Sequence, residues 1–367
     1  MTIATAILRQ VHDLQPYVPG RPIEAVAREH GIDPAAIIKL ASNENPFGMS
    51  PAARQAIAAL YGNPSRYPDS DKALLRDALA GNLSLPAEQV LVSAGSTELI
   101  LLAARAVLEA GRAAVMSQYA FVYYSMAVRS VGAEAVVVPA RDWGHDLDRM
   151  LAAIDARVRL VFIASPNNPT GTLLAKADIE RFLAAVPAHV LVVLDEAYRE
   201  FVPVADRPDT QELLRRHDNL LILRTFSKIH GLAGLRVGYG LGSAELVGYL
   251  RRLLLPFNVS VSAQSAAMAA LSDRQFVTDC VDANNSERTR LCDALRVRGI
   301  DFVPSHGNFV LLRVGDGAGI FGSLLGRGIV VRPVANYGLP EWIRVSVGLP
   351  SENDAFIREL SALLPPR

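Results

Sequence analysis

Short apolar stretches alternate regularly with amphipathic stretches between residues 89 and 165, and this alternation limits the folds open to the chain. The apolar stretches suit buried strands, and the segments between them have the periodicity of helices. We expect strands at 90–94, 113–117, 133–139 and 159–165, with helices at 96–111 and near 121–131 and 147–155. This order is typical of a mostly parallel central sheet with helices on both faces. The sequence therefore predicts an α/β fold.

Polar residues follow the predicted strands at their carboxyl ends, which is where sheets of this kind bind their ligands. Gly95, Ser96 and Thr97 open a helix, a position that suits a phosphate and equally an ordinary helix cap. Asn168 lies in the turn-rich stretch SPNNPTGT, and Asp195 directly follows the apolar run HVLVVL. A carboxylate at that depth needs a cationic partner, which is either an arginine or a protonated heterocycle.

A further apolar strand, Leu221 to Leu223, leads into a segment of small residues that carries Lys228 and Arg236. Lys228 is one of only four lysines, although lysine and arginine together number 37. A lysine amine loses its proton when it is partly desolvated and can then bond covalently to a carbonyl carbon, which an arginine cannot do. Two interpretations stay open at this point: a surface lysine after a strand, or a reactive amine at the mouth of the sheet.

The pattern changes after about residue 252, where long alanine-rich helices (262–298) precede strand-like runs at 308–314, 328–334 and 341–348. We predict an N-terminal arm (1–38) that packs with a small domain, a large domain (39–255) and a smaller α+β domain (256–367). Arg332 and Arg344 both emerge from strands of the smaller domain. An arginine in such a place is either paired with a carboxylate or available to an anionic ligand.

The composition is that of a globular protein able to bury a large core, with 50% hydrophobic and 20% charged residues. The 37 basic and 37 acidic residues balance, so nothing suggests a nucleic-acid or membrane partner. Cys280 and Cys292 lack metal-ligand spacing, and we expect reduced thiols and no metal site. Because the first residues lack signal-peptide features and no run is long enough to span a membrane, we expect a cytoplasmic protein.

Four motifs, taken in their order along the chain, resemble those of the fold type I pyridoxal-phosphate aminotransferases. They are NNPTG with Asn168, DEAY with Asp195 and Tyr198, TFSK with Lys228, and GLAGLRVGY with Arg236. Within that superfamily, the stretches LQPYVPG, LASNENP, SRYP and VRPVANYGLPEWIRVSVG resemble the histidinol-phosphate aminotransferases over nearly the whole chain.

The resemblance implies that pyridoxal 5′-phosphate is the cofactor and that Lys228, Asp195 and Tyr198 are catalytic. Lys228 would hold the cofactor aldehyde covalently and then act as general base and acid on the substrate. Asp195 would keep the pyridine nitrogen protonated. Asn168 and Tyr198 would hydrogen-bond the ring oxygen, and Tyr119 would stack on the ring face.

The resemblance also assigns groups to the cofactor phosphate, namely Arg236, Ser227, Thr225 and the helix start at Gly95 and Ser96. Tyr67 would reach the phosphate of the neighbouring subunit, which implies a homodimer.

Arg344 resembles the arginine that binds the α-carboxylate of glutamate, and it would also serve the phosphate of histidinol phosphate. Arg332, Tyr17 and Asn43 would complete the substrate pocket.

Two positions depart from the family pattern. Thr97 stands where the family usually has Asp, which puts a side-chain role there in doubt. After the lysine, Ile229 and His230 replace the usual Ala and aromatic residue. We interpret His230 as a packing residue at the domain hinge.

The implied reaction exchanges the amino group of L-histidinol phosphate with 2-oxoglutarate in histidine biosynthesis. Two other readings share much of the machinery: an aromatic amino-acid aminotransferase and, from another reaction class, a threonine-phosphate decarboxylase. A non-enzymatic protein with a vestigial fold is disfavoured because Lys228, Asp195 and Arg236 are all intact.

Overall fold

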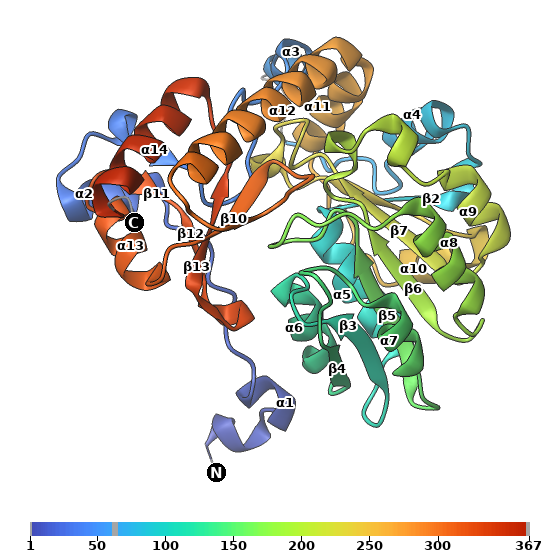
Figure 1. The fold of residues 1–367 in the computed structure, drawn as a ribbon. Coiled ribbons are helices and arrows are strands. Elements are labelled where there is room, and N and C mark those ends of the chain that lie inside the picture. Colours follow the sequence, from blue (N-terminus) through green and yellow to red (C-terminus); the bar gives the residue numbers. More distant parts are fainter. Residues whose placement is uncertain (1, 61–64, 365–367) are drawn as a thin grey trace.

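A seven-stranded sheet forms the centre of the larger domain in the computed structural model, which describes residues 2–60 and 65–364 (Figure 1). Its strand order is β2-β8-β7-β6-β5-β3-β4. The strands are β2 (Val90–Ser93), β3 (Ala113–Ser117), β4 (Glu134–Val138), β5 (Val158–Ala164), β6 (Leu191–Asp195), β7 (Leu220–Thr225) and β8 (Gly238–Leu241). Only β8 runs against the others, since it pairs antiparallel with both of its neighbours. The predicted mostly parallel α/β fold is confirmed.

Helices cover both faces of this sheet because side chains alternate between the faces along each strand. In β6, Val192 and Leu194 face one buried cluster, whereas Leu191 and Val193 face the other. The first face carries α3 (Pro51–Ala59), α4 (Ala73–Leu83), α7 (Leu147–Ala152), α8 (Lys176–Ala185), α9 (Thr210–Arg216) and α11 (Val261–Ser272). The second face carries α5 (Ser96–Val107), α6 (Val122–Ser130) and α10 (Ala244–Arg251).

The sequence pattern did not predict β8, which contains two glycines in its four residues and no apolar run. A Cβ atom added at Gly238 would lie 2.7 Å from the backbone nitrogen of Ser96 and 2.9 Å from the carbonyl oxygen of Arg224. Real Cβ contacts are not that short, so only glycine lets β8 fit beside β7 and the start of α5.

A four-stranded antiparallel sheet of order β12-β13-β10-β9 forms the smaller domain (Figure 1). Its strands are β9 (Phe302–Val303), β10 (Phe309–Arg313), β12 (Arg332–Val334) and β13 (Leu339–Ser346). The helices are α12 (Arg274–Val297), α13 (Gly317–Leu325) and α14 (Pro350–Leu363). The predicted strand at 328–334 is divided, because β11 (Ile329–Val330) pairs instead with β1 (Ile38–Lys39) in a separate parallel pair. A strand from the N-terminal part of the chain therefore pairs with a strand of the smaller domain.

Hydrophobic packing crosses both predicted domain boundaries. Leu40 lies in the hydrophobic core of the smaller domain, although the large domain was predicted to begin at residue 39. At the other boundary, Ala263 and Ala267 of α11 pack in the core of the large domain beyond the predicted end at residue 255. Small side chains let α11 approach the large domain closely, and helix periodicity alone does not show which partner it packs against.

The N-terminal arm contacts both domains. Its helix α2 (Ile23–His30) buries Val26 and Ala27 against Leu325 and Val330 of the smaller domain. Its short helix α1 (Arg9–His12) lies against α6 of the large domain. No helix in residues 2–60 and 65–364 combines the length and apolar character that a membrane crossing requires.

Replacing Phe162 by alanine is expected to destabilise the large domain. The Phe162 side chain in β5 is fully buried, and its ring stacks on Tyr124 of α6 with 4.6 Å between centroids. Removing it leaves a cavity in a packed core, so we expect Phe162→Ala to lower the free energy of unfolding by about 3–5 kcal/mol in a urea titration. Val297→Ala, at a site 84% exposed, serves as the control and should stay within about 0.5 kcal/mol of the parent. Equal stability of the two variants would contradict this account of the core.

Candidate active site

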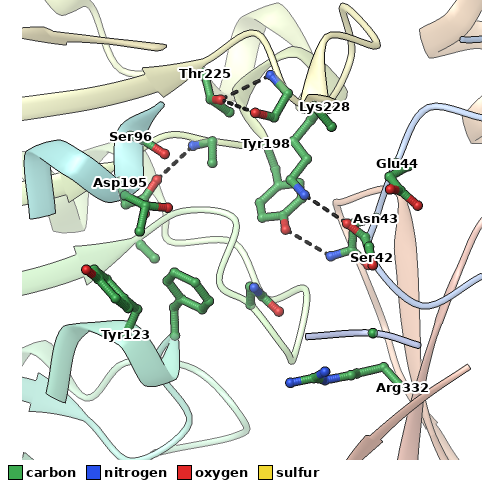
Figure 2. A pocket seen from close by; sticks show the side chains of 18 of the residues that line it. Ser42, Asn43, Glu44, Ser96, Tyr123, Asp195, Tyr198, Thr225, Lys228 and Arg332 are labelled. Atoms are coloured by element: carbon green, nitrogen blue, oxygen red, sulfur yellow. Dashed lines mark hydrogen bonds between the residues drawn. The ribbon is translucent and has the colours of Figure 1, made fainter. Parts of the chain in front are cut away.

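A cavity of about 520 Å³ lies where the carboxyl ends of the central strands meet the smaller domain. Asp195, Lys228 and Thr225 reach it from the large domain, and Arg332 and Arg344 from the smaller one. Figure 2 shows Lys228, Tyr198 and Asn43 pointing toward one another inside it. Parallel strands place their carboxyl ends at one edge of the sheet, and this is why residues far apart in sequence converge here.

Asp195 is a buried carboxylate at the centre of the sheet edge. It is the last residue of β6 and pairs in register with Ala164 of β5 and Leu223 of β7. The Tyr124 hydroxyl donates a hydrogen bond to its Oδ2 at 2.8 Å, and the Ala197 backbone N–H donates to its Oδ1 at 3.0 Å. Burial raises the pKa of Asp195, and these two hydrogen bonds work against that rise. The carboxylate is thus oriented by neutral donors.

The ion pair with an arginine that we considered for Asp195 is formed instead by the next residue, Glu196. Glu196 forms ion pairs with Arg224 at 2.7 Å and with Arg199 at 2.8 Å. Among the described residues, Asp195 has no ion pair. It therefore remains available to a cationic group inside the cavity, such as a protonated heterocycle.

Lys228 follows β7 and extends into the cavity rather than over the outer surface of the domain. Its ammonium group donates a hydrogen bond to the Ser42 carbonyl oxygen at 3.0 Å and lies 5.7 Å from the centre of the Tyr198 ring. Burial, and next the positive charge of Arg344, lower the pKa of Lys228 to about 8. An amine with this pKa is partly neutral near physiological pH, which a carbonyl-bonding lysine requires.

Tyr198 and Asn43 join the two domains beside the lysine. The Asn43 amide donates to the Tyr198 hydroxyl at 2.9 Å, and the backbone of Asn43 donates to Ser346 of β13 at 2.8 Å. Asn43 has a left-handed backbone (φ 52°), which asparagine tolerates better than most residues. Burial raises the pKa of Tyr198 to about 12, so its hydroxyl stays protonated and can donate a hydrogen bond.

Arg344 and Asn168 meet across the same cleft. The guanidinium group of Arg344 donates to the Asn168 side-chain oxygen and to the Ala41 carbonyl oxygen. Its Nε has no partner within the described residues, and the side chain is buried. Burial lowers the pKa of Arg344. A buried guanidinium group without a carboxylate is the arrangement that an anionic ligand completes.

Small residues and hydroxyl groups line the part of the cavity next to the first turn of α5. The Thr225 hydroxyl donates to the Ser227 hydroxyl at 2.9 Å, and Arg236 lies 3.4 Å from the same oxygen. Gly95 has a φ of 85°, and a Cβ there would lie 2.7 Å from Nη2 of Arg236. The glycine thus leaves room for the arginine at a helix N-terminus, and these groups fit a phosphate.

Ser96 and Thr97 both line the cavity, so the position that departs from the family pattern faces it.

Two of the predicted aromatic residues, Tyr119 and Tyr67, do not line this chain's own cavity. The Tyr119 ring stacks on Trp143 at 5.4 Å and is not among the residues that line the cavity, whereas Phe121 and Tyr123 are. Two neighbouring aromatic residues of one segment compete for such a role, and sequence spacing does not decide between them. Tyr67 is 81% exposed and stacks on Phe257 at 4.5 Å, away from this chain's own cavity.

Two of the predicted substrate-pocket residues, Arg332 and Tyr17, contact each other. The guanidinium group of Arg332 lies 5.8 Å from the centre of the Tyr17 ring, and both residues line the cavity. His230, by contrast, packs against Phe226 with 4.8 Å between ring centroids and is not among the lining residues. Burial lowers the pKa of His230 to about 4, which fits a neutral packing residue.

Sequence reasoning missed several contributors to the site. Tyr124 orients Asp195, and the Ser42 carbonyl holds Lys228. Tyr337 lines the cavity from the smaller domain. Ser42 adjoins Asn43 in the SNENP motif, which was a usable signal. The sequence around Tyr124 carried no such signal. Its role depends on the fold, which brings its hydroxyl from α6 to Asp195 at the end of β6.

The unusual pKa of Lys228 predicts selective chemical labelling. With the cofactor removed, reductive methylation of the Lys228 amine should increase with pH and reach half its maximum near pH 8, since only the neutral amine reacts. Mass spectrometry of the peptide that contains Lys228 measures this. In Arg344→Gln the midpoint should move upward, because a like charge has been removed. A midpoint at the ordinary lysine value of 10.5 in both proteins would contradict the geometry.

Comparisons with known proteins identify the family to which the chain belongs. The family model for aminotransferase class I and II matches residues 35–360. The chain is 49% identical to histidinol-phosphate aminotransferase 1 of Cupriavidus pinatubonensis over 96% of this chain and 95% of the relative. It is 50% identical to histidinol-phosphate aminotransferase 2 of Pseudomonas aeruginosa over 96% of each chain.

A solved structure is similar over nearly the full length. It is histidinol-phosphate aminotransferase from Sinorhizobium meliloti in complex with pyridoxal-5′-phosphate, with a TM-score of 0.88 and 31% identity over 98% of this chain and 96% of that one. From the family model, the full-length relatives and this structural match, the chain belongs to the aminotransferase class I and II family.

Proposed function

We propose that this protein is a pyridoxal-phosphate-dependent aminotransferase that exchanges the amino group of L-histidinol phosphate with 2-oxoglutarate in histidine biosynthesis, in the cytoplasm. The observation that carries the proposal is the joint presence of Lys228 and Asp195 in one cavity with the arginines Arg332 and Arg344. Those arginines have no carboxylate partner among the described residues. The names of the relatives described above suggest histidinol phosphate as the substrate, and the arginines of the cavity suit its phosphate.

The residues around Lys228 fit the proposed cofactor. When it is bound, pyridoxal phosphate supplies a ring that withdraws electrons from the substrate's α-carbon. Lys228 holds the cofactor through Nζ and afterwards carries the proton to and from that carbon, a task that suits an amine with a pKa of about 8. Asp195, fixed by Tyr124, keeps a proton on the ring nitrogen.

Two neutral donors would orient the cofactor ring. The Tyr198 hydroxyl stays protonated and can donate to the ring oxygen. The side-chain oxygen of Asn168 accepts from Arg344, which leaves its amide nitrogen as the second donor. Asn168 would then link the cofactor ring to Arg344, which we propose binds the substrate.

The two arginines would select anionic substrates. Glutamate has an α-carboxylate and histidinol phosphate has a phosphate instead, and a guanidinium fork binds either with paired hydrogen bonds. Arg344 is held by Asn168 and Ala41, and its Nε has no partner among the described residues, so the side chain is positioned before substrate arrives. Arg332 lies over Tyr17 nearer the entrance and can meet the outer anionic group.

The cofactor spectrum with one substrate at a time distinguishes the candidate functions. Histidinol phosphate alone, without a keto acid, should rapidly change the absorbance of the protein-bound cofactor, and phenylalanine should do so only slowly. Equal or faster reaction with phenylalanine would instead favour an aromatic amino-acid aminotransferase. Release of carbon dioxide from threonine phosphate would favour the decarboxylase.

Lys228→Ala is the control for this measurement. Without the amine no proton is carried to or from the substrate, so turnover should fall by at least roughly a thousandfold. If turnover were unchanged in Lys228→Ala, the proposed mechanism would be wrong.

We propose a homodimer in which Tyr67 completes the partner's site. Its support is an exposed aromatic pair, Tyr67 (81% exposed) and Phe257 (40%), whose rings stack at 4.5 Å, with the exposed Leu255 (67%) two residues before Phe257. Exposed apolar side chains gathered in this way usually mark a protein–protein contact.

Mixed dimers test whether Tyr67 acts across the interface. Tyr67→Ala and Lys228→Ala should each be impaired, because one lacks the phosphate contact and the other lacks the amine. A dimer that contains one chain of each variant should have one complete site, since the Tyr67→Ala chain keeps Lys228 and receives Tyr67 from its partner. Co-expression with two affinity tags isolates this species, and its turnover should approach half of the parent value. Activity no higher than that of Tyr67→Ala alone would place Tyr67 in its own subunit's site.

A further inference from the structure

A second lysine, Lys72, has little solvent-exposed surface and does not line the proposed active site. It directly precedes α4, its side chain is 4% exposed, and its backbone has a φ of 52°. Within the described residues it forms no ion pair, and its ammonium group donates a hydrogen bond to Oδ1 of Asn258 at 2.8 Å. A buried ammonium group is costly to desolvate, so its retention calls for a compensating partner.

Asn258 connects this lysine to a carboxylate. Its Nδ2 donates to Oε2 of Glu98 at 2.7 Å, while its Oδ1 accepts from Lys72. The two ends of the amide thus face charges of the sign that each prefers, and this fixes its orientation. Lys72 and Glu98 thereby act on each other through one amide group.

Glu98 in turn holds the loop that opens α5. It lies in the first turn of the helix, and its Oε2 accepts the Ala94 backbone N–H at 2.7 Å. Ala94 precedes Gly95 and Ser96, where we have placed the cofactor phosphate. One carboxylate oxygen therefore anchors this loop and also receives the hydrogen bond from Asn258.

This arrangement creates an electrostatic conflict that Lys72 can relieve. A carboxylate in the first turn of α5 suits the helix dipole, but it repels a phosphate dianion bound at the same helix end. A buried positive charge linked to that carboxylate offsets the repulsion. Burial lowers the pKa of Lys72 and the negative charge of Glu98 raises it, so the two groups are electrostatically coupled.

We propose that Lys72 and Asn258 are positioning residues for the cofactor phosphate: they fix Glu98 against the Ala94 N–H, and the Lys72 charge compensates Glu98 in front of the phosphate. The proposal rests on the proposed function, because it takes the phosphate of pyridoxal phosphate to bind beside Gly95, Ser96 and Arg236 in the candidate active site. Neither residue needs to touch the cofactor.

The test compares binding of pyridoxal phosphate with binding of pyridoxal, which lacks the phosphate, to the full-length protein after removal of its cofactor. The absorbance of the bound aldehyde gives both dissociation constants. Lys72→Met should raise the constant for pyridoxal phosphate roughly tenfold and leave that for pyridoxal within about twofold, because only the phosphate meets the uncompensated carboxylate.

The double variant Lys72→Met/Glu98→Gln separates charge compensation from a merely structural role. Glutamine keeps an oxygen that can accept from Ala94 but carries no charge, so affinity for pyridoxal phosphate should return to within about threefold of the parent. If the double variant bound pyridoxal phosphate as weakly as Lys72→Met or more weakly, charge compensation would be refuted. Equal weakening for pyridoxal would likewise overturn the proposal, because the lysine would then only support the fold.

Two further variants complete the design. Lys176→Met, which removes an exposed lysine whose amine contacts the Ala205 carbonyl, should leave both constants unchanged. Arg236→Ala should weaken binding of pyridoxal phosphate selectively if the phosphate lies where we propose. A normal result for Arg236→Ala would refute that placement, whereas selective weakening there together with normal binding in Lys72→Met would refute only the role of Lys72.

Discussion

The site depends on the burial of a carboxylate, Asp195, at the end of a strand that is covered on both faces. Such a group stays useful only if it is oriented without being neutralised, and the structure achieves this with the Tyr124 hydroxyl and the Ala197 N–H. The adjacent Glu196 takes both nearby arginines, which keeps them away from Asp195. Asp195 ends β6 and Glu196 follows it, and the two neighbouring acids have different tasks because they have different partners.

Hydrogen bonds between the domains assemble the rest of the site. Asn43 reaches Tyr198, the Ser42 carbonyl receives Lys228, and Arg344 reaches Asn168. Each bond joins a group in the large domain to one in the smaller domain or in the segment next to Leu40, which packs in the core of the smaller domain. The pKa of Lys228 therefore depends on both domains, because Arg344 of the smaller domain is one of the groups that lower it.

Sequence patterns predicted the central sheet well because strands buried on both faces are continuous apolar runs, and residues after such strands must converge at one edge. The positions of Asp195, Asn168 and Lys228 in the cavity follow from that geometry. The patterns failed for β8, where Gly238 is selected by the closeness of other backbones, and for α11, whose alanines do not reveal their partner. Neither property is periodic in the sequence, so each became visible only in three dimensions.

Lys228 and Lys72 show that the groups around a lysine determine its role in the protein. Lys228 donates to a neutral carbonyl. Among the charged groups around it, Arg344 has the largest effect on its pKa, and this positive charge favours the neutral amine. Lys72 is joined to Glu98 through Asn258, and this negative charge favours the ammonium form. Burial favours the neutral form of both amines. The two lysines differ because the main neighbouring charge is positive for Lys228 (Arg344) and negative for Lys72 (Glu98). In our proposal one lysine then becomes the reactive amine, while the other stays a fixed charge behind the phosphate loop.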